Sequence, residues 1–412
     1  MVTKWLKKLA PAVVVVALLM AASSLVHTAP PTQGAEDVVT QYGADANPTG
    51  NPIGGGYGYV SPHGYSQATA DYVVTTLSQL STALASATSG QVIWIPSGTT
   101  ITISSAYGKT IKPGVVLASS RGKDGAAGGK IKWTYTSGSG MTALLSCQSN
   151  SKVSGVVLEG PIGTSGTSGT YGGSNIGLRG VDGSYGIEVE NCEISKFALA
   201  GIYFNDGLLN DSNRHYVHHC YIHNCQRHGF GYGISEEGSS AFLAEANIFD
   251  ENRHHIMAQA GLTNPNSYEV RYNKFYEAIY ASDGDIYGTW YYSHQVDCHG
   301  GADYGSSYYA GNVLKIHHNT FYENPGKPNV CIRGIPKTLC EVSWNWTVKK
   351  GTDTGQNPSS SQWAQYVSTS YYQRMTVHDN WYGTTPPSGG VVNGAPATPS
   401  APAGTSSGVI ST

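Results

Sequence analysis

Apolar and polar residues alternate in short segments that recur along most of the chain. Five of these segments read FLAEANIF, YEVRYNKF, LKIHHNTF, CEVSWNW and MTVHDNWY, and each has an asparagine after a short turn: Asn247, Asn273, Asn319, Asn345 and Asn380. Two earlier segments, IEVENCEI and HYVHHCYI, have Cys192 and Cys220 in the same place. These seven marker positions are 28, 27, 26, 46, 26 and 35 residues apart. The spacing indicates a repeat of about 26 to 28 residues with two insertions.

Two rows of residues run through the repeats. The residues three positions before each marker are all apolar, and they are Val189, Val217, Ala244, Val270, Ile316, Val342 and Val377. The residues two positions before it are polar, and they are Glu190, His218, Glu245, Arg271, His317, Ser343 and His378. Because the side chains of a strand alternate between its two sides, the first row is predicted to face the core and the second to face water. Glu245 and Arg271, neighbours in the second row, are predicted to form a surface ion pair worth at most about 1 kcal/mol.

A coil of this length cannot bury its apolar side alone, so successive coils are predicted to stack on one another. Stacking at the ~4.8 Å spacing of strands turns each repeat position into a ladder. An inward asparagine at a tight turn can then satisfy backbone groups of the turn and bond to the asparagine of the next coil. Without such partners a buried amide would be costly. The sequence therefore predicts an asparagine ladder inside a solenoid.

The repeat from about residue 145 to 383 and its asparagine ladder resemble the right-handed parallel β-helix of the pectate-lyase-like superfamily. The segment VIWIPSGTTITI (92–103) resembles the entry strand of such proteins, and residues 71–88 have the apolar spacing of a helix that covers the end of the solenoid. The expected fold class is all-β, a right-handed parallel β-helix with a short N-terminal capping helix. The superfamily includes lyases, hydrolases, epimerases, phage tailspikes and non-catalytic surface proteins, so the resemblance implies no single function.

The two ends of the chain differ from the repeats in composition. Residues 1–35 contain three lysines followed by LAPAVVVVALLMAA, which is the pattern of a secretory signal peptide, with an uncleaved anchor as the alternative. We expect a flexible lead-in over 36–65, the β-helix over 66–384, and a Pro/Gly/Ser/Thr-rich tail over 385–412. The expected location is outside the cell or on its surface, with no membrane span after cleavage of the signal.

Composition narrows the range of partners. The chain has a formal net charge of -3 and no basic run, so nucleic acid is not an expected partner. Its seven cysteines show no C-x-x-C pair, so no disulfide framework is implied, and buried free thiols are favoured for Cys192 and Cys220. Zinc binding by the His218 to Cys225 segment is disfavoured because alternate residues of a strand point in opposite directions.

The candidate chemistry lies in a region rich in histidine. Nine of the 14 histidines fall between His215 and His299. The resemblance implies that the third strand of each coil lines a substrate cleft, and HQVDCHGG (294–301) lies on that strand, with Cys298 predicted to point inward. The expected catalytic residues are Asp297, His299, His255, His254 and Arg253. The expected substrate-binding residues are His228, Arg227, Tyr232, Gln259, Asp303 and Arg333, with His228 stacked on His255. No metal site is predicted among them, although Asp283 and Asp285 could bind calcium.

Imidazoles, guanidinium groups and carboxylates together suit proton transfer on a glycan and neutralisation of a uronate, and nearby tyrosines could stack on sugar rings. The chain lacks the paired aspartates, G-H-G and R-I-K elements of polygalacturonases and the arginine-rich signature of pectate lyases, so no catalytic residue is carried over from them. Two hypotheses remain open. The first is a secreted enzyme, a lyase or a glycoside hydrolase, that cleaves a polysaccharide. The second is a non-catalytic surface or adhesive β-helix protein that binds glycans, in which the histidines are only packing.

Overall fold

The computed structural model of the chain describes residues 42–136, 140–162, 173–205, 207, 210–281, 290–322, 324, 327–348 and 374–384. The predicted signal peptide (1–35), the predicted tail (385–412) and the calcium candidates Asp283 and Asp285 lie outside these residues.

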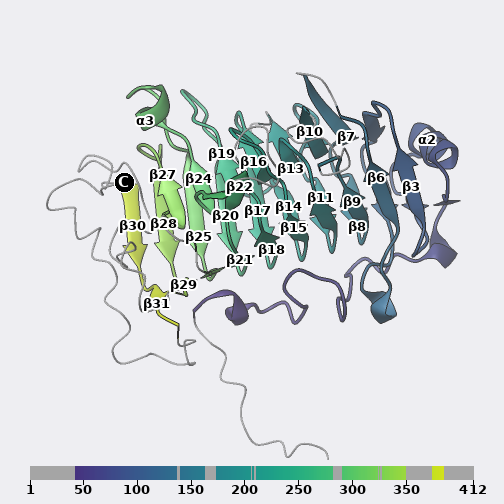
Figure 1. Cartoon of the computed structure of the whole chain (residues 1–412), viewed down its shortest axis with the longest axis horizontal. Coiled ribbons are helices and arrows are strands. Elements are labelled where there is room, and N and C mark those ends of the chain that lie inside the picture. The colour runs from purple at the N-terminus through teal and green to yellow at the C-terminus, as the bar shows by residue number, and fades with distance from the viewer. Residues whose placement is uncertain are drawn as a thin grey trace, which may run out of the picture. The chain divides into compact units, whose positions relative to one another are not determined.

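The described residues form three parallel sheets whose strands follow one another in each coil (Figure 1). Sheet A contains β1 (Tyr72–Val73), β2 (Val92–Trp94), β5 (Val116–Ala118), β8 (Lys152–Ser154), β11 (Glu188–Glu190), β14 (His215–His218), β17 (Ala241–Glu245), β20 (Ser267–Arg271), β25 (Val313–His317), β28 (Leu339–Ser343) and β30 (Met375–His378). Sheet B contains β3 (Thr100–Ile103), β6 (Lys130–Trp133), β9 (Val157–Glu159), β12 (Glu193–Ser195), β15 (Tyr221–His223), β18 (Ile248–Asp250), β21 (Lys274–Phe275), β26 (Thr320–Phe321), β29 (Trp346–Thr347) and β31 (Trp381–Tyr382). Sheet C contains β4 (Lys109–Ile111), β7 (Met141–Cys147), β10 (Ser174–Gly180), β13 (Ala200–Asn205), β16 (Tyr232–Glu237), β19 (His254–Ala258), β24 (Val296–Cys298) and β27 (Val330–Ile332).

The remaining elements lie outside this stack of strands. An insertion between β21 and β24 forms an antiparallel hairpin of β22 (Ile279–Ala281) and β23 (Trp290–Tyr292). The short helix α3 (Gly301–Tyr304) follows β24, and three 3-10 turns cover Ala44–Ala46, Gln67–Thr69 and Lys123–Gly125. The predicted parallel β-helix is confirmed, with a core that runs from Leu80 to Met375 inside the three sheets.

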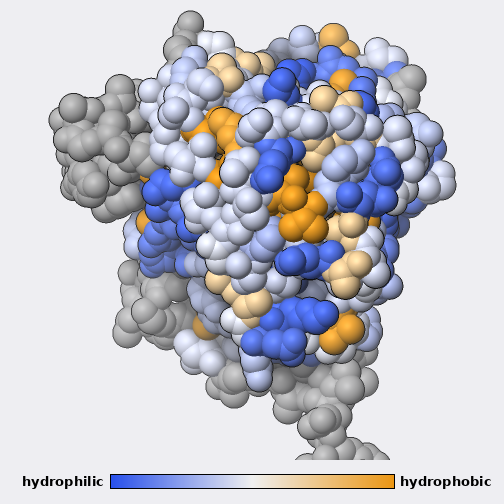
Figure 2. Space-filling view, turned by 90° about the vertical axis from the view of Figure 1, so that its right-hand side faces the viewer, coloured by the Kyte–Doolittle hydropathy of each residue, from blue (hydrophilic) through white to orange (hydrophobic). Residues whose placement is uncertain are grey.

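A helix covers the first coil, as the sequence predicted. The helix α2 (Leu77–Ser86) begins at a capping box in which Thr76 accepts from the Gln79 amide, and it buries Leu80, Ala83 and Leu84 in the core. Seen from this end, the surface mixes polar side chains with small apolar areas and shows no continuous apolar face (Figure 2). The expected entry strand at 92–103 is two strands, β2 and β3, of that coil. Among the described residues, no helix is both long and apolar enough to span a membrane.

The asparagine ladder lies between sheets A and B and is confirmed. The residue before each marker has a left-handed backbone, as at Tyr272 (φ 59) and His318 (φ 56), which makes the chain turn sharply. The marker that follows is buried: Asn273 Nδ2 donates to Ala244 O at 3.0 Å and to Asn319 Oδ1 at 2.9 Å. Asn319 Oδ1 also accepts from the Asn273 backbone N–H at 3.0 Å. All seven cysteines are buried and free, and Cys220 Sγ accepts from the Cys192 amide in the same ladder.

Replacing Asn319 with leucine is expected to lower the free energy of unfolding by about 1 to 3 kcal/mol, because leucine keeps the volume but leaves turn groups of two neighbouring coils unpaired. Urea unfolding measures this. His317 is the control because it lies two residues away, on the outer side of the strand, and His317→Ala should cost less than about 1 kcal/mol. Equal losses in the two variants would contradict the register of the ladder.

Residues 42–65, the described part of the expected flexible lead-in (36–65), pack against the solenoid. Residues 42–65 run along the turns between sheets A and B, from the late coils toward β2 (Figure 1). The amide of Gly43 donates to Trp344 O, that of Gly54 to Ala246 O, and that of Gly56 to Asn191 Oδ1. A Cβ on Gly55 would lie 2.2 Å from His219 O, so only glycine fits there. The glycine-rich sequence thus allows close contact with the turns.

The second row was expected to face water throughout, and this is wrong for several of its members. Glu190 is fully buried, because it accepts hydrogen bonds from Tyr59 and Ser61 of the N-terminal segment and from Ser154 of the preceding coil. Glu245 is buried against Arg271, whose Nε lies 2.7 Å from Glu245 Oε1, which confirms the predicted ion pair. The row does point away from the core, but neighbouring side chains and the N-terminal segment cover it.

Candidate functional site

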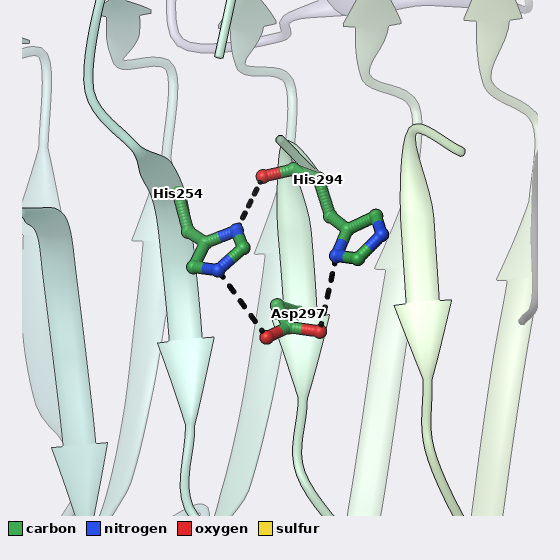
Figure 3. Close-up of side chains that lie close together, drawn as sticks. All are labelled: His254, His294 and Asp297. Carbon is green, nitrogen blue, oxygen red and sulfur yellow. Dashed lines mark hydrogen bonds and ion pairs between the residues drawn. The ribbon is translucent and has the colours of Figure 1, made fainter. Parts of the chain in front are cut away.

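Six polar side chains from three consecutive coils gather on the outer side of sheet C. His254 begins β19, His294 and Asp297 belong to the next coil at β24, and Arg333 follows β27. His299 follows β24, and Asp303 lies in α3. We call these six residues the Asp297 cluster. Figure 3 shows His254 and His294 on either side of the Asp297 carboxylate.

The centre of the cluster is a fully buried carboxylate, with 0% of Asp297 exposed. Arg333 donates to it with two nitrogens, Nε to Oδ1 at 2.9 Å and Nη2 to Oδ2 at 2.9 Å. Three imidazole nitrogens lie farther off: His254 Nε2 at 3.5 Å, His294 Nδ1 at 3.6 Å and His299 Nε2 at 3.4 Å from the nearest carboxylate oxygen. The neighbours of Asp297 in the same row of sheet C are Met257 and Cys331, so the charge is confined to one coil.

Charges around Asp297 decide its ionisation. Burial alone would raise the pKa of this carboxyl group, but the neighbouring imidazoles and the Arg333 guanidinium act against burial and hold its pKa well below the usual range. Burial lowers the pKa of His254 well below its ordinary value, and the Arg253 cation adds to this effect. The Nδ1 of His254 donates to His294 O at 2.8 Å, which turns Nε2 toward Asp297.

His299 and Asp303 form the outer part of the cluster. His299 Nδ1 lies 3.1 Å from Asp303 Oδ2, and Arg333 Nη1 donates to Asp303 Oδ1 at 3.3 Å. Burial would raise the pKa of Asp303, but His299 and Arg333 lower it below its usual value. Two loops meet closely here, since a Cβ on Gly334 would lie 2.5 Å from the Gly301 amide and a Cβ on Gly300 would lie 2.7 Å from Ala310 Cβ. The lack of a side chain at Gly300, the first glycine of HGG, thus permits the contact in which the Ala302 amide of α3 donates to Arg333 O.

The expectation that Asp297 and His299 share a face while Cys298 points inward is confirmed, because Cys298 is buried in the core. His294 was not predicted as a site residue, although it lies in the same segment. Its ring stacks on His254 at 5.6 Å between centroids, since the two residues are equivalent in adjacent coils. Alignment of HHIMA with HQVDC at this register places His294 opposite His254 and would have indicated His294 as a site residue.

The expectation for His255 is wrong. The amides of His255 and Ile256 both donate to one carbonyl, Gln295 O, so the strand is irregular at this point although its register with the next coil does not change. The alternation breaks here, and the side chains of His255 and Ile256 are both buried inside the solenoid. The His255 ring packs beside the stacked rings of Phe249 and Phe275, and its Nε2 donates to Tyr276 O. Burial lowers its pKa to about 3. His255 is therefore a neutral core residue.

Five other predicted residues lie beside the cluster or apart from it. Tyr232 is 5% exposed and stacks on His254 at 5.8 Å, so it cannot offer its face to a sugar. Arg253 lies over the Tyr232 and Tyr280 rings, and Gln259 donates to the Tyr304 hydroxyl at 2.8 Å. Arg227 donates to Gly173 O at 2.8 Å. His228 was expected to stack on His255, which is wrong: it is exposed, beside Tyr280, because the structure aligns Tyr232 with His254.

Two groups of described residues have ligand atoms close enough to hold a metal ion. In the first, atoms of His254, His294 and Asp297 lie within 4.8 Å of one another, but the Arg333 guanidinium already occupies both carboxylate oxygens. In the second, His63, Glu188 and Glu190 lie close together, and the Lys152 ammonium contacts Glu188. A cationic side chain thus already neutralises a carboxylate in each group.

Only the outer side of the Asp297 cluster can meet a ligand. The side chains of His299 and Asp303 are 19% and 25% exposed, whereas Asp297 and His254 are closed off. Tyr304, beside His299 at 6.0 Å between ring centroids, is 46% exposed and presents an aromatic surface. The cluster can therefore exchange a proton through His299 or Asp303, with Asp297 beneath them as a fixed negative charge.

Comparisons with known proteins agree with this architecture. Residues 149–335 match the family model described as right handed beta helix region. The fold and this match define the chain as a right-handed parallel β-helix protein. Among solved structures, ORF18 of Geobacillus virus E2 is similar at 13% identity and a TM-score of 0.39, over 66% of this chain and 49% of that one. The chain thus spans about half the length of that structure. No curated protein matches.

Proposed function

We propose that the protein is a secreted carbohydrate-active enzyme that cleaves a polysaccharide at the Asp297 cluster, as a lyase or a glycoside hydrolase. The observation that carries the proposal is the ionised, fully buried Asp297 in a two-point contact with Arg333, surrounded by three histidines. Desolvating such charges is costly, and apolar side chains of similar volume often stabilise a fold equally well. Perturbed groups of this kind are more common at functional sites than elsewhere.

In this proposal His299 exchanges the proton with the substrate, and Asp297 and Asp303 hold its ring from both sides. Arg333 is a positioning residue, because its guanidinium donates to both carboxylates. This departs from the expectation that Arg333 binds the substrate directly. Arg253, which lies over the Tyr280 ring, is the cation we propose for an acidic sugar, and Tyr304 supplies a surface for stacking.

The test is to incubate the purified chain with a panel of uronate-containing and neutral polysaccharides, and to measure both unsaturated products and new reducing ends. Unsaturated products indicate a lyase, and reducing ends without them indicate a hydrolase. The matched control is the His299→Ala variant, which separates cleavage by this protein from cleavage by a contaminant. Absence of cleavage on every substrate, together with binding to one of them, would favour the non-catalytic glycan-binding protein instead.

A further inference from the structure

A cavity of about 390 Å³ lies between the N-terminal segment and the outer side of sheet A, on a different sheet from the Asp297 cluster. Its walls include Tyr59, Ser61 and Tyr65 of the N-terminal segment. On the solenoid side, Trp94, Ser119 and Ser154 line it, together with the loop from Arg121 to Asp124. The volume is near the lower end of the ~300 to 1,000 Å³ range of small-molecule sites, so a ligand of one or two rings fits better than a chain.

The register of sheet A explains why this space exists. Trp94, Ala118, Ser154 and Glu190 occupy one outward row in four successive coils. Ala118 and Ser154 are small, so the row is recessed between the indole of Trp94 and the carboxylate of Glu190. The N-terminal segment spans the recess instead of filling it.

The roof of the cavity is fixed in place. Tyr59 donates to Glu190 Oε2 and Ser61 donates to Glu190 Oε1, each at 2.7 Å. Arg121 Nη1 donates to Gly54 O at 3.1 Å and to Asn191 Oδ1 at 3.2 Å, which ties the loop to the same segment. Because both walls are held by buried hydrogen bonds, the cavity is preformed, and a ligand pays little ordering cost on binding.

The lining combines groups that recognise an acidic sugar. The Ser120 hydroxyl lines the cavity and can bond to a sugar hydroxyl, and the half-buried Tyr65 supplies aromatic surface. Trp94, which is 4% exposed, closes one wall. Lys123 and Arg121 also line the cavity, together with the carboxylate of Asp124. Lys123 is exposed, whereas Arg121 Nε lies 3.8 Å from Glu193 Oε2, so Lys123 is the cation open to a ligand.

We infer that this cavity is a second binding site, which takes one acidic sugar unit with its carboxylate toward Lys123. The inference goes beyond the proposed cleavage reaction and does not require it. A site of this kind would hold an acidic glycan on the protein away from the Asp297 cluster.

The test is isothermal titration of the full chain with D-galacturonate, D-glucuronate and D-galactose. At least one of the two acids is expected to bind saturably, and at least about tenfold more tightly than galactose, because a charge-assisted contact is lost with the neutral sugar. Lys123→Ala should weaken binding of that acid by about tenfold, and Ser120→Trp, which places a large ring in the cavity, should abolish it. Lys123 is exposed, so its removal should leave the fold intact.

Two controls separate this site from the Asp297 cluster. Lys109→Ala removes an exposed lysine from sheet C and should leave binding unchanged. His299→Ala should also leave it unchanged, even if it abolishes cleavage. The inference is overturned if neither acid binds, or if binding survives both Lys123→Ala and Ser120→Trp. It is also overturned if binding is lost in His299→Ala, which would place the sugar at the Asp297 cluster.

Discussion

Replacing His299 with alanine is expected to lower turnover of the cleaved polysaccharide by about 100-fold or more, while the midpoint of thermal unfolding changes little. His299 is the imidazole on the solvent side of the Asp297 cluster, and loss of a general acid or base typically costs 10² to 10⁴ in rate. Its partial exposure means that alanine leaves no buried cavity. Steady-state kinetics on purified variant and wild type, with unfolding followed by circular dichroism, measure both quantities.

His255→Ala is the control for His299→Ala, because the structure places His255 inside the solenoid. It should lower the free energy of unfolding by about 2 to 5 kcal/mol, since it opens a space beside Phe249 and Phe275 and leaves buried groups unpaired. Turnover per folded molecule should remain near that of the wild type. Unchanged turnover in His299→Ala on a proven substrate would show that the cluster is a packing feature and that cleavage occurs elsewhere.

Replacing Asp297 with asparagine is expected to destabilise the fold by about 3 kcal/mol near pH 7. The change keeps the shape of the side chain but leaves the Arg333 cation without its main counter-charge, and breaking a buried pair typically costs ~3 to 5 kcal/mol. We expect the lower end of this energy range, because the Arg333 side chain is 15% exposed and keeps its contact with Asp303. The control is Asp303→Asn, which removes the more exposed partner and should cost about 1 kcal/mol or less.

The effect of Asp297→Asn should depend on pH in a defined direction. The pKa of Asp297 is depressed in the folded state, so its contribution to stability is complete above the unfolded value of about 3.9 and declines as the pH falls further, toward the folded pKa. Urea unfolding of wild type and variant at pH 7 and at pH 3 measures the difference. The difference in free energy of unfolding between wild type and variant should be smaller at pH 3 than at pH 7. A larger difference at pH 3 would mean that Asp297 is protonated in the native state.

The sequence by itself determined the repeat, the asparagine ladder and the side of the strand on which several site residues lie. A row of asparagines every 26 residues or so can be buried only if each one bonds to the next, so Asn273 and Asn319 could be assigned without coordinates. Strict alternation likewise placed Asp297 and His299 together and Cys298 inside. These features depend on local periodicity, which the sequence records directly.

Contacts between residues that are far apart in the sequence depend on the tertiary structure and could not be predicted from local patterns. Alternation along the strand predicts that His255 and Ile256 face opposite sides, yet both are buried inside, where both amides donate to Gln295 O of the next coil. The pairing of Arg333 with Asp297 depends on the packing of successive coils and on the close approach of Gly301 and Gly334. The N-terminal segment looked flexible because its glycines favour many conformations, yet the same glycines let its backbone bond to the turns of coils more than 100 residues away.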